Sequence, residues 1–362
     1  MGGQERAVLL HAEGLLKRGH QVRLVLEPDS PICKLANGKD LQVDAVSMRR
    51  LCYPSAILAF RRLIAHERPA VLHVNSSRDS WIGALAARLV RARPKIVRTR
   101  HISTPLNRNA TTRLLYRQLV DMVIVTGSEL TRRALIERDG LDAGRVAAFP
   151  IGLDLDEFRP GAPQRDLRQE LGLPPGHRLV GLISYLRAYK GHEFFVEAAA
   201  RVLPRVKDVT FLIVGEGPEE QAIRSQIAAR GLTRQVLMLG FREDLLEVFR
   251  SLDLFVIPSV EGDTIPQVLM QAMALGLPVI STTVGSIPDV VQDGTTGFVV
   301  PPRDAGALAE RIVALLADPD LRHAMGARGR ALVECEYSLE RMLDRLEEVY
   351  RQADGARKRG GA

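Results

Sequence analysis

Two short segments in the second half of the chain carry residues suited to binding a phosphorylated ligand. In the first, Arg187-Ala188-Tyr189-Lys190-Gly191-His192, two cations lie three residues apart between an apolar run and a helical pattern. Cations in this position can stabilise the negative charge that builds on a diphosphate leaving group. The second, Val214-Gly215-Glu216-Gly217-Pro218, is a glycine turn that opens a helix, and by itself it is also typical of a plain turn.

A third segment, residues 258–274, joins an acidic glycine loop to the start of an apolar helix. Asp263 lies before the expected helix and Gln271 lies inside it, so both can face the same ligand. Pro266 suits the first turn, where free backbone N–H groups carry a partial positive charge that favours a phosphate or a sugar hydroxyl. The alternative is a turn in which the aspartate caps the helix and the glutamine is solvated.

Basic and histidine side chains also gather at the end of an apolar run in the first half. Arg98, Arg100 and His101 lie at the end of an expected strand, where they suit a phosphate-bearing or sugar acceptor. The alternative for the arginines is an exposed loop of solvated charge. His73 lies on the apolar run 70–75, and we expect it in the core or at the edge of a cleft.

Metal ligands are not indicated by the sequence. Asp154-Leu155-Asp156 has an Asp-x-Asp pattern, but it lies in a turn-rich crossing, so we expect a structural role. No histidine, cysteine or acidic cluster has the spacing of metal ligands, and we expect neither a metal nor another cofactor. Cys33, Cys52 and Cys335 are odd in number and far apart, which argues against a disulfide framework and fits a reducing cytosol.

The composition is that of a globular protein with 362 residues, 46% of them apolar, which is long enough for two domains. No apolar run approaches the ~18 residues needed to span a bilayer, and no signal peptide is recognisable. The formal charge of +7 is uneven, with 25 Lys and Arg against 13 Asp and Glu in residues 1–150, and 25 against 30 in residues 151–362. The basic first half favours an anionic partner: a membrane surface, a phosphorylated acceptor or nucleic acid. Only 5% of the residues are Phe, Trp or Tyr, which argues against nucleic acid.

Residues 49–64 alternate cations with large apolar side chains. This pattern fits a helix that lies on an anionic membrane, and it also fits an ordinary helix packed on its own sheet. We therefore expect a cytoplasmic protein, with peripheral contact at the inner face of the cell membrane left open as an alternative.

Apolar runs alternate with helical patterns along the chain, which predicts the α/β class with parallel sheets. In the first half, strands are expected at 21–26, 41–46, 70–75, 95–99 and 121–126, and helices at 4–19, 53–67, 79–92, 108–120 and 128–138. In the second half, strands are expected at 179–184, 209–214, 235–240, 253–257, 278–281 and 297–300, and helices at 191–204, 218–230, 243–251, 266–276, 286–292, 304–317 and 320–354. We expect two doubly wound domains that face a cleft, 1–150 and 151–340, with a crossing at 149–160. Residues 341–362 form the end of the last helix and a basic tail that we expect to be disordered from 357.

The first helix follows a glycine loop, Gly2-Gly3, of the kind that normally comes after the first strand of a nucleotide-binding unit. No strand precedes this loop in the sequence. Either the reading frame begins upstream of Met1, or the first sheet lacks a central strand and leaves an unpaired slot.

Together these segments resemble the retaining glycosyltransferases of family 4, which have the GT-B architecture of two Rossmann-like domains. The resemblance extends over nearly the whole chain. Its motifs are Gly2-Gly3-x-Glu5, Gly19-His20-x-Val22, His101, Gly152-x-Asp154 with Phe158 and Pro160, Lys190-Gly191, Gly215-x-Gly217-Pro218, Pro258-Ser259, Ala272-Met273-Ala274-x-Gly276-x-Pro278-Val279-Ile280 and Asp293-Gly294-x-x-Gly297-Phe298-x-Val300-x-Pro302.

The resemblance implies transfer of a sugar with retention from a nucleotide diphosphate sugar, without a metal. Arg187 and Lys190 would bind the diphosphate, Gln271 the ribose, and His101 the sugar near its reacting carbon. The leaving phosphate itself would take the acceptor proton, so no protein nucleophile is required. The catalytic residues would be His101, Asp263, Arg187 and Lys190. The other residues expected to contact the donor are Gly2, Gly3, Gly215, Glu261, Gly262, Thr264 and Ile265.

The sequence departs from the family pattern at the donor site. Where the family has two glutamates eight residues apart, this chain has Asp263 and Gln271, with Glu261 two residues earlier. Gln can accept a hydrogen bond from a ribose hydroxyl without the charge assistance of a carboxylate, so we expect weaker nucleotide binding at that contact. The arginine that often lies five residues before the lysine is Tyr185 here, which leaves Arg187 as its substitute.

We therefore expect a glycosyltransferase of envelope polysaccharide or lipopolysaccharide synthesis, with a nucleotide-sugar donor and a glycan or lipid-linked acceptor as partners. One alternative is a nucleotide-sugar epimerase or hydrolase of the same fold, in which water replaces the second sugar. Another is a non-catalytic protein that binds anionic membranes.

Overall fold

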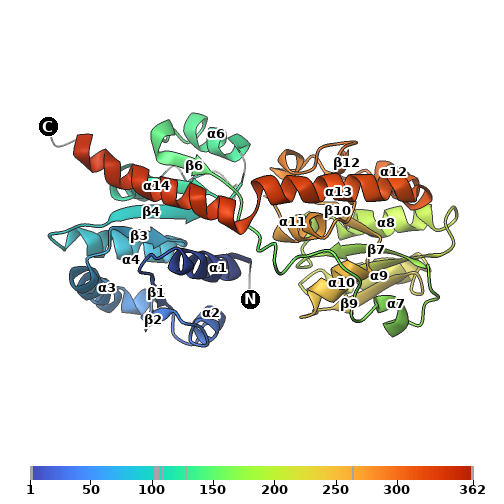
Figure 1. Ribbon diagram of the computed structural model, residues 1–362, viewed down its shortest axis with the longest axis horizontal. Coiled ribbons are helices and arrows are strands. Elements are labelled where there is room, and N and C mark those ends of the chain that lie inside the picture. Colours follow the sequence, from blue (N-terminus) through green and yellow to red (C-terminus); the bar gives the residue numbers. More distant parts are fainter. Residues whose placement is uncertain (1–2, 102–105, 108, 128, 263–264, 360–362) are drawn as a thin grey trace. The chain divides into compact units, whose positions relative to one another are not determined.

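The computed structural model describes residues 3–101, 106–107, 109–127, 129–262 and 265–359, and Figure 1 shows its elements. The chain forms two compact units: unit 1 combines Met1–Gly152 with Leu339–Ala362, and unit 2 is Leu153–Ser338. The division after Gly152 falls inside the turn-rich crossing expected at 149–160. The residues from 341 onward, expected as a separate segment, belong to unit 1.

Unit 1 is built from short parallel strands and the helices that connect them. Its strands are β1 (Arg23–Leu26), β2 (Gln42–Ala45), β3 (Val71–Val74), β4 (Lys95–Arg100), β5 (Met122–Val125) and β6 (Val146–Ala148). Its helices are α1 (Gly3–Lys17), α2 (Pro31–Ala36), α3 (Tyr53–Glu67), α4 (Ser77–Arg88), α5 (Ala110–Leu114), α6 (Glu129–Glu137) and α14 (Leu339–Arg359), with short turns η1 (Arg50–Cys52), η2 (Leu115–Leu119, a π-turn) and η3 (Ala143–Arg145).

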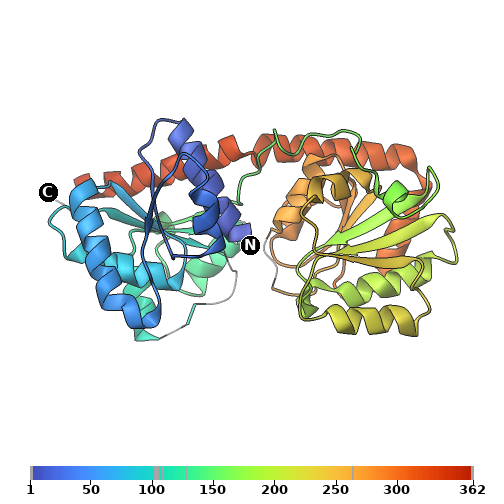
Figure 2. The same cartoon turned by 90° about the horizontal axis from the view of Figure 1, so that it is seen from below.

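The strands of unit 1 form two separate parallel sheets. One contains β3, β4, β5 and β6 in that order, and the other contains β1 and β2. In the described part of the chain β1 pairs only with β2, and β3 pairs only with β4. Side chains of α3, α4 and η2 cover one face of the larger sheet, and those of α1 and α14 cover the other. Figure 2 shows this sheet between its helices.

Unit 2 contains one six-stranded parallel sheet. Its strands are β7 (Arg178–Ile183), β8 (Val209–Val214), β9 (Val236–Gly240), β10 (Leu254–Ile257), β11 (Val279–Thr282) and β12 (Gly297–Val300). Its helices are α7 (Leu167–Glu170), α8 (His192–Val202), α9 (Glu220–Ala229), α10 (Leu245–Ser251), α11 (Gln267–Ala274), α12 (Ala305–Ala317) and α13 (Pro319–Glu336), with turns η4 (Ala188–Lys190) and η5 (Ile287–Asp289).

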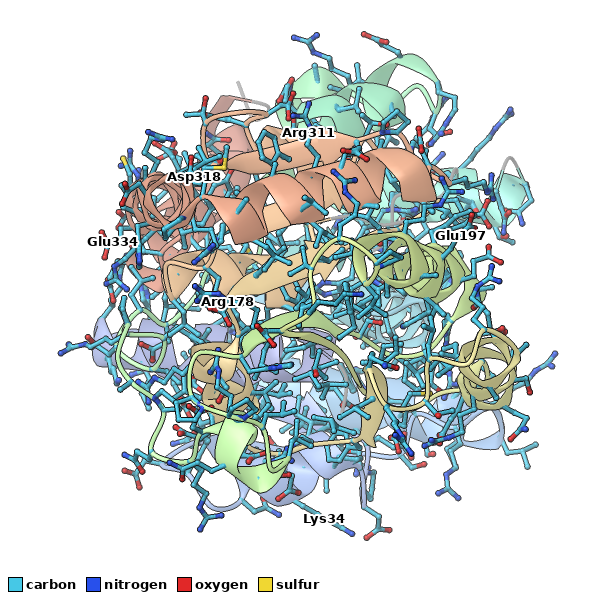
Figure 3. All side chains as sticks on the ribbon, turned by 90° about the vertical axis from the view of Figure 1, so that its right-hand side faces the viewer. Lys34, Arg178, Glu197, Arg311, Asp318 and Glu334 are labelled. Carbon is cyan, nitrogen blue, oxygen red and sulfur yellow. The ribbon has the colours of Figure 1, made fainter. Side chains whose placement is uncertain are left out.

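The order of the strands in unit 2 is β12-β11-β10-β7-β8-β9, which is the doubly wound Rossmann order. The direction of winding reverses between β7 and β10, and such a switch point is where open α/β sheets bind ligands. Apolar side chains of α8, α9 and α12 pack on one face and those of α10 and α11 on the other. Figure 3 shows the charged side chains around this core, including Arg311, whose guanidinium lies 4.4 Å from the ring centre of Phe298.

The strands expected from apolar runs are all present, but three helical predictions are wrong in part. The helix expected at 320–354 is two helices, and at the break between α13 and α14 the Leu153 N–H donates to the Tyr337 carbonyl at 2.9 Å. The helix expected at 286–292 is only the turn η5, with Pro288 in it. The tail expected to be disordered from 357 continues α14 as far as Arg359. The sequence analysis also missed β6, α2 and α7, which are short.

Candidate functional site

The loops after β7 and β10 are held together at the switch point of unit 2. Gly191 ends η4 with a φ of 72°, and a Cβ atom built on it would lie 2.0 Å from the Pro258 carbonyl oxygen. The Val260 N–H donates to the Tyr189 carbonyl at 2.8 Å. The turn that carries Arg187 and Lys190 is therefore fixed against the start of the loop 258–265, because only glycine permits so close an approach.

The glycine turn after β8 packs against the other side of the β7 loop. Gly215 has a φ of 135°, and a Cβ atom there would lie 1.9 Å from the Ser184 carbonyl oxygen. The Leu186 N–H donates to the Glu216 carbonyl at 2.8 Å. The close packing of two loops at the carboxyl ends of β7 and β8 therefore requires a glycine at position 215, whether or not a ligand binds there.

The cations on this scaffold lie at the surface. Arg187 is exposed and its guanidinium is 5.2 Å from the ring centre of Tyr185, while Lys190 is half-buried with its ammonium 5.3 Å from the ring of Tyr189. His192, the first residue of α8, is buried and its Nε2 lies 2.9 Å from Ser184 Oγ. Burial, with the charge of Lys190 as a smaller cause, lowers the pKa of His192 to about 4. The histidine is neutral near pH 7, so the positive charge here comes from Arg187 and Lys190.

The third expected segment lies between β10 and α11. Gln271 is buried within α11, which begins one residue after Pro266, so the proline precedes the first turn. Glu261 and Gly262 are exposed, and Ile265 is half-buried against the core of unit 2. Asp263 and Thr264 lie outside the described residues, as does Gly2 at the other end of the chain. Gly3 is the first residue of α1 in unit 1.

Three histidines gather on one face of the larger sheet of unit 1. His73 of β3 lies 2.6 Å from Thr99 Oγ1 through Nε2 and 2.7 Å from the Tyr350 hydroxyl of α14 through Nδ1. Burial lowers the pKa of His73 to about 3, with smaller contributions from His11 and His101. Burial also lowers the pKa values of His11 and His101 to about 4. The Nε2 atoms of His11 and His101 are buried without a hydrogen-bond partner in the described structure.

Two arginines lie on the opposite face of the same sheet. The guanidinium carbons of Arg98 and Arg100 lie 4.6 and 5.8 Å from the ring centre of Tyr116 in η2. Arg100 Nη1 donates to the Tyr116 hydroxyl at 3.0 Å, and Arg98 Nη2 donates to Ser77 Oγ of α4 at 3.2 Å. Both arginines are buried, in contrast to the solvated loop that was one alternative.

The structure therefore separates Arg98 and Arg100 from His101, three residues that the sequence grouped together. Successive side chains of a strand point to opposite faces, and the alternation is visible in β4. Arg98 and Arg100 contact α4 and η2, whereas Thr99 faces His73 and α14. The sequence analysis did not propose His73, Ser77 or Tyr116 as partners of this segment. Only the alternation of side chains along a strand could have indicated that Arg98 and Arg100 lie on one face of the sheet and Thr99 on the other.

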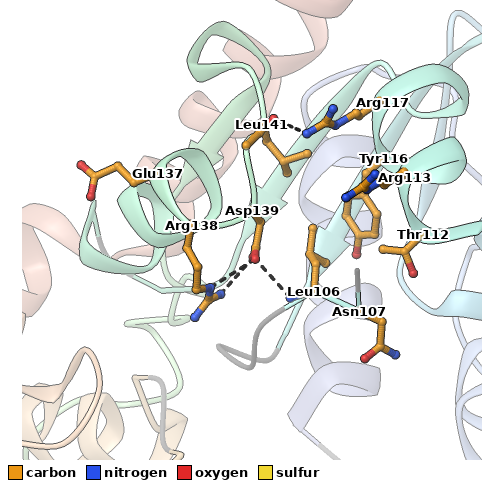
Figure 4. Close-up of a pocket in the computed structure, with 11 residues that line it drawn as sticks. Leu106, Asn107, Thr112, Arg113, Tyr116, Arg117, Glu137, Arg138, Asp139 and Leu141 are labelled. Atoms are coloured by element: carbon orange, nitrogen blue, oxygen red, sulfur yellow. Dashed lines mark hydrogen bonds and ion pairs between the residues drawn. The ribbon is translucent and has the colours of Figure 1, made fainter. Parts of the chain in front are cut away.

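A hollow of about 300 Å³ lies next to the arginine pair in unit 1. Figure 4 shows Tyr116 on one side of it and Asp139 on the other. Asp139 accepts hydrogen bonds from Arg138 (3.0 Å) and the Leu106 N–H (3.3 Å); burial raises its pKa, but these bonds lower it overall. The lining residues are Leu106, Asn107, Thr112, Arg113, Tyr116, Arg117, Glu137, Arg138, Asp139, Gly140 and Leu141. They come from two separate segments, 106–117 and 137–141, so no local pattern in the sequence indicated the hollow.

The Asp-x-Asp segment closes a turn. Asp154 Oδ1 accepts the N–H of Asp156 at 2.9 Å, and Asp156 pairs with Arg159. Among the described residues, no group of three or more histidine, cysteine or acidic side chains is arranged to hold a metal ion.

Known proteins match the chain along nearly its full length. Residues 1–157 match the family model Glycosyltransferase Family 4, and residues 177–318 match Glycosyl transferases group 1. The phosphatidyl-myo-inositol mannosyltransferase of Mycobacterium leprae (strain TN) is 32% identical over 364 residues, which cover 96% of this chain and 92% of that protein.

Solved structures share the fold. A glycosyltransferase from Rickettsia africae ESF-5 has a TM-score of 0.86 at 20% identity, covering 97% of this chain and 95% of that one. Anabaena HepE in complex with UDP has a TM-score of 0.81 at 22% identity, covering 96% and 95%. The two Rossmann-like units are thus those of the GT-B fold. With the full-length similarity of sequence, the chain belongs to the family 4 glycosyltransferases.

Proposed function

We propose that this enzyme transfers a sugar, with retention and without a metal, from a nucleotide diphosphate sugar to a glycan or lipid-linked acceptor of the cell envelope. The observation that carries the proposal is the turn with Arg187 and Lys190, fixed by Gly191 at the switch point of a Rossmann-like sheet. A diphosphate leaving group gains negative charge as the glycosidic bond breaks, and two cations beside it stabilise that charge. Both residues lie within the segment that matches the group 1 family model.

We also propose further donor contacts. Gln271 in α11 would bind the ribose, and the loop that carries Glu261 and Gly262 would bind the transferred sugar. Asp263 and Thr264 belong to this loop in the sequence. In a front-face substitution the leaving phosphate oxygen takes the acceptor proton, so the protein supplies charge stabilisation and orientation. His101, neutral near pH 7, would accept or donate a hydrogen bond to the sugar without adding charge.

The relatives support a nucleotide donor and a lipid-linked acceptor as classes. HepE was crystallised with UDP and with UDP-glucose, and the mycobacterial relative is a phosphatidyl-myo-inositol mannosyltransferase. We also propose a cytoplasmic enzyme that touches the inner face of the membrane. Leu51 is 97% exposed in η1, beside the exposed cations Arg49 and Arg50. No helix in the described residues is long and apolar enough to cross a bilayer.

Nucleotide binding is the first test. The melting temperature of the protein would be measured with UDP, GDP, ADP and CDP, because a ligand that binds only the folded state raises it. One nucleotide should stabilise the protein, and this shift should shrink in Lys190→Ala. If no nucleotide stabilises the protein, a nucleotide-sugar enzyme of any kind is ruled out and the membrane-binding alternative remains.

A second measurement separates transfer from hydrolysis and epimerisation. With the stabilising nucleotide identified, its sugar conjugates would be incubated with and without membrane extract, and the anomeric configuration of the product would be determined by NMR. Transfer that depends on the extract, with an unchanged anomeric configuration, supports the proposal. Release of free sugar without the extract at the rate of turnover would identify a hydrolase, and conversion to an epimer would identify an epimerase.

A further inference from the structure

Among the residues that the structure describes, none forms an ion pair with the buried guanidinium of Arg98. The residue is 6% exposed, and its Nε and Nη1 atoms have neither solvent contact nor a hydrogen-bond partner in the described structure. Its contacts with described side chains are neutral: Nη2 donates to Ser77 Oγ at 3.2 Å, and the ring of Tyr116 lies 4.6 Å from the guanidinium carbon. Burying a charged group in this way is costly unless hydrogen bonds and an opposite charge compensate it.

Both a cation and a carboxylate lie near Arg98, but neither forms an ion pair with its guanidinium in the described structure. Arg100 packs on the same Tyr116 ring, and burial together with this neighbouring cation lowers the pKa of Arg98. The nearby carboxylate of Asp79 already accepts hydrogen bonds from the N–H groups of Asn75 (3.0 Å) and Ser76 (2.8 Å), where it closes the capping box of α4. An arginine stays protonated in proteins, so the guanidinium of Arg98 keeps its positive charge.

The position of this charge suits a ligand. Ser77 is exposed at the first turn of α4, directly after β3, and Arg98 and Arg100 belong to the end of the neighbouring strand β4. Ligands of open α/β sheets bind beyond the carboxyl ends of the strands, and the amino end of a helix favours a negative group. The N–H groups of Arg98 that have no hydrogen-bond partner in the described structure point to an anion site independently of the helix terminus.

We propose that Arg98, flanked by Arg100 and Ser77, binds a phosphoryl group carried by the acceptor. That the ligand is an acceptor rests on the proposed function, whereas the presence of the anion site does not. A phosphoryl group offers several oxygens and up to two negative charges, which match two guanidinium groups better than a single carboxylate does. The site is distinct from the diphosphate contact of Arg187 and Lys190 in unit 2.

Stability distinguishes a ligand-binding arginine from a structural one. Arg322 is a matched control, because it is also 6% exposed, but its Nη1 donates to the carbonyls of Leu315 and Leu316. Arg322→Met should lower the melting temperature, since it leaves two carbonyls unsatisfied. Arg98→Met should leave it unchanged or raise it, since a methionine of similar length removes an unpaired buried charge.

Phosphate binding supplies the second readout. All proteins would carry Lys190→Ala to weaken the diphosphate site, and inorganic phosphate would replace chloride at constant ionic strength. We expect a concentration-dependent stabilisation that is at least tenfold weaker in Arg98→Met and unchanged in Arg322→Met. Glycerol phosphate and vesicles of phosphatidylglycerol would then be compared. Stabilisation by the soluble phosphoester alone indicates an acceptor with a free phosphate group. Binding to the vesicles that is lost in Arg98→Met indicates a lipid phosphate.

The inference is overturned if Arg98→Met loses as much stability as Arg322→Met, or if both proteins respond equally to phosphate. It is also overturned if phosphate stabilises neither protein. Failure of the proposed function looks different, because it is the absence of stabilisation by every nucleotide in the unmodified chain. A phosphate response that depends on Arg98 would stand even then, as an anion site in a protein without donor binding.

Discussion

The two candidate sites are built in opposite ways. In unit 2 the cations Arg187 and Lys190 reach the surface, and their positions are set by backbone contacts between loops, with glycines at the points of closest approach. In unit 1 the arginines and Thr99 of β4 are themselves buried, and the half-buried His73 of β3 lies on the other face of the sheet from the arginines.

This difference affects how much the side chains of each site change the stability of the folded protein. Exposed cations remain hydrated when no ligand is present, so they can be removed with little loss of stability. Buried histidines and arginines must stay neutral or find partners, so the fold and the site depend on each other. Replacement of a site cation in unit 2 should therefore reduce activity with little change in stability. Replacement of a site residue in unit 1 should change both the function and the stability of the protein.

Removal of the Lys190 side chain should produce the largest effect. Lys190→Ala is expected to lower kcat/KM by about 10³-fold, because the developing charge on the diphosphate loses a cation, with a melting temperature close to that of the unmodified enzyme. Arg201→Ala is the control, since Arg201 is an exposed cation of the same unit, and it forms an ion pair with Glu197 in its own helix. Enzyme kinetics and thermal unfolding measure the two properties, and a variant that keeps most of its activity would refute this placement of the diphosphate.

The sequence was sufficient for the framework that positions Lys190. Each strand of unit 2 is an apolar run bounded by turn residues, and the glycine turns at 191 and 215 mark the loops that approach each other. It was insufficient where the outcome depends on packing between distant segments. Tyr350 meets His73, and Tyr116 meets Arg98, across 277 and 18 positions of sequence. Local patterns carry no information about such partners.

A change at Gly215 tests the claim that backbone packing fixes the site in unit 2. Gly215→Ala would place a Cβ atom 1.9 Å from the Ser184 carbonyl oxygen, so we expect a loss of about 2–4 kcal/mol in the free energy of unfolding. Gly231→Ala is the control, because Gly231 also has a positive φ but has open space around it, and we expect about 1 kcal/mol. Urea denaturation gives both values. Equal losses in the two variants would mean that φ strain, and not loop packing, explains the glycine.

The histidines of unit 1 should make stability depend on pH. The folded pKa of His73 is about 3 and those of His11 and His101 about 4, against about 6.5 in the unfolded chain. At a pH between the folded and the unfolded pKa values, the unfolded chain binds more protons than the folded protein. The free energy of unfolding is therefore highest above pH 6.5 and falls as the pH drops towards 4. Each histidine contributes up to one proton to this slope, or about 1.4 kcal/mol per pH unit.

Replacement of His73 isolates its share of this slope. His73→Gln keeps an amide that can contact Thr99 and Tyr350 but does not titrate, so the slope between pH 6.5 and 4 should decrease by up to one proton. His66→Gln, the same substitution at an exposed position of α3, is measured beside it as the control. Urea unfolding at several pH values measures the slopes. An unchanged slope in His73→Gln would show that this histidine is protonated equally in the folded and unfolded chains.

Gln271 is an exception in unit 2, because its side chain is buried, whereas Arg187 and Glu261 are exposed and Lys190 is half-buried. Gln271→Glu restores the residue type that the family pattern has at this position, and a carboxylate would accept the ribose hydroxyl with charge assistance. We expect nucleotide binding about fivefold tighter, or about 1 kcal/mol, together with a slightly lower stability of the free enzyme, because the new carboxylate is desolvated until the nucleotide arrives. Thermal shifts with and without nucleotide separate the two effects. Weaker binding would show that the amide nitrogen of Gln271 donates a hydrogen bond that a carboxylate cannot replace.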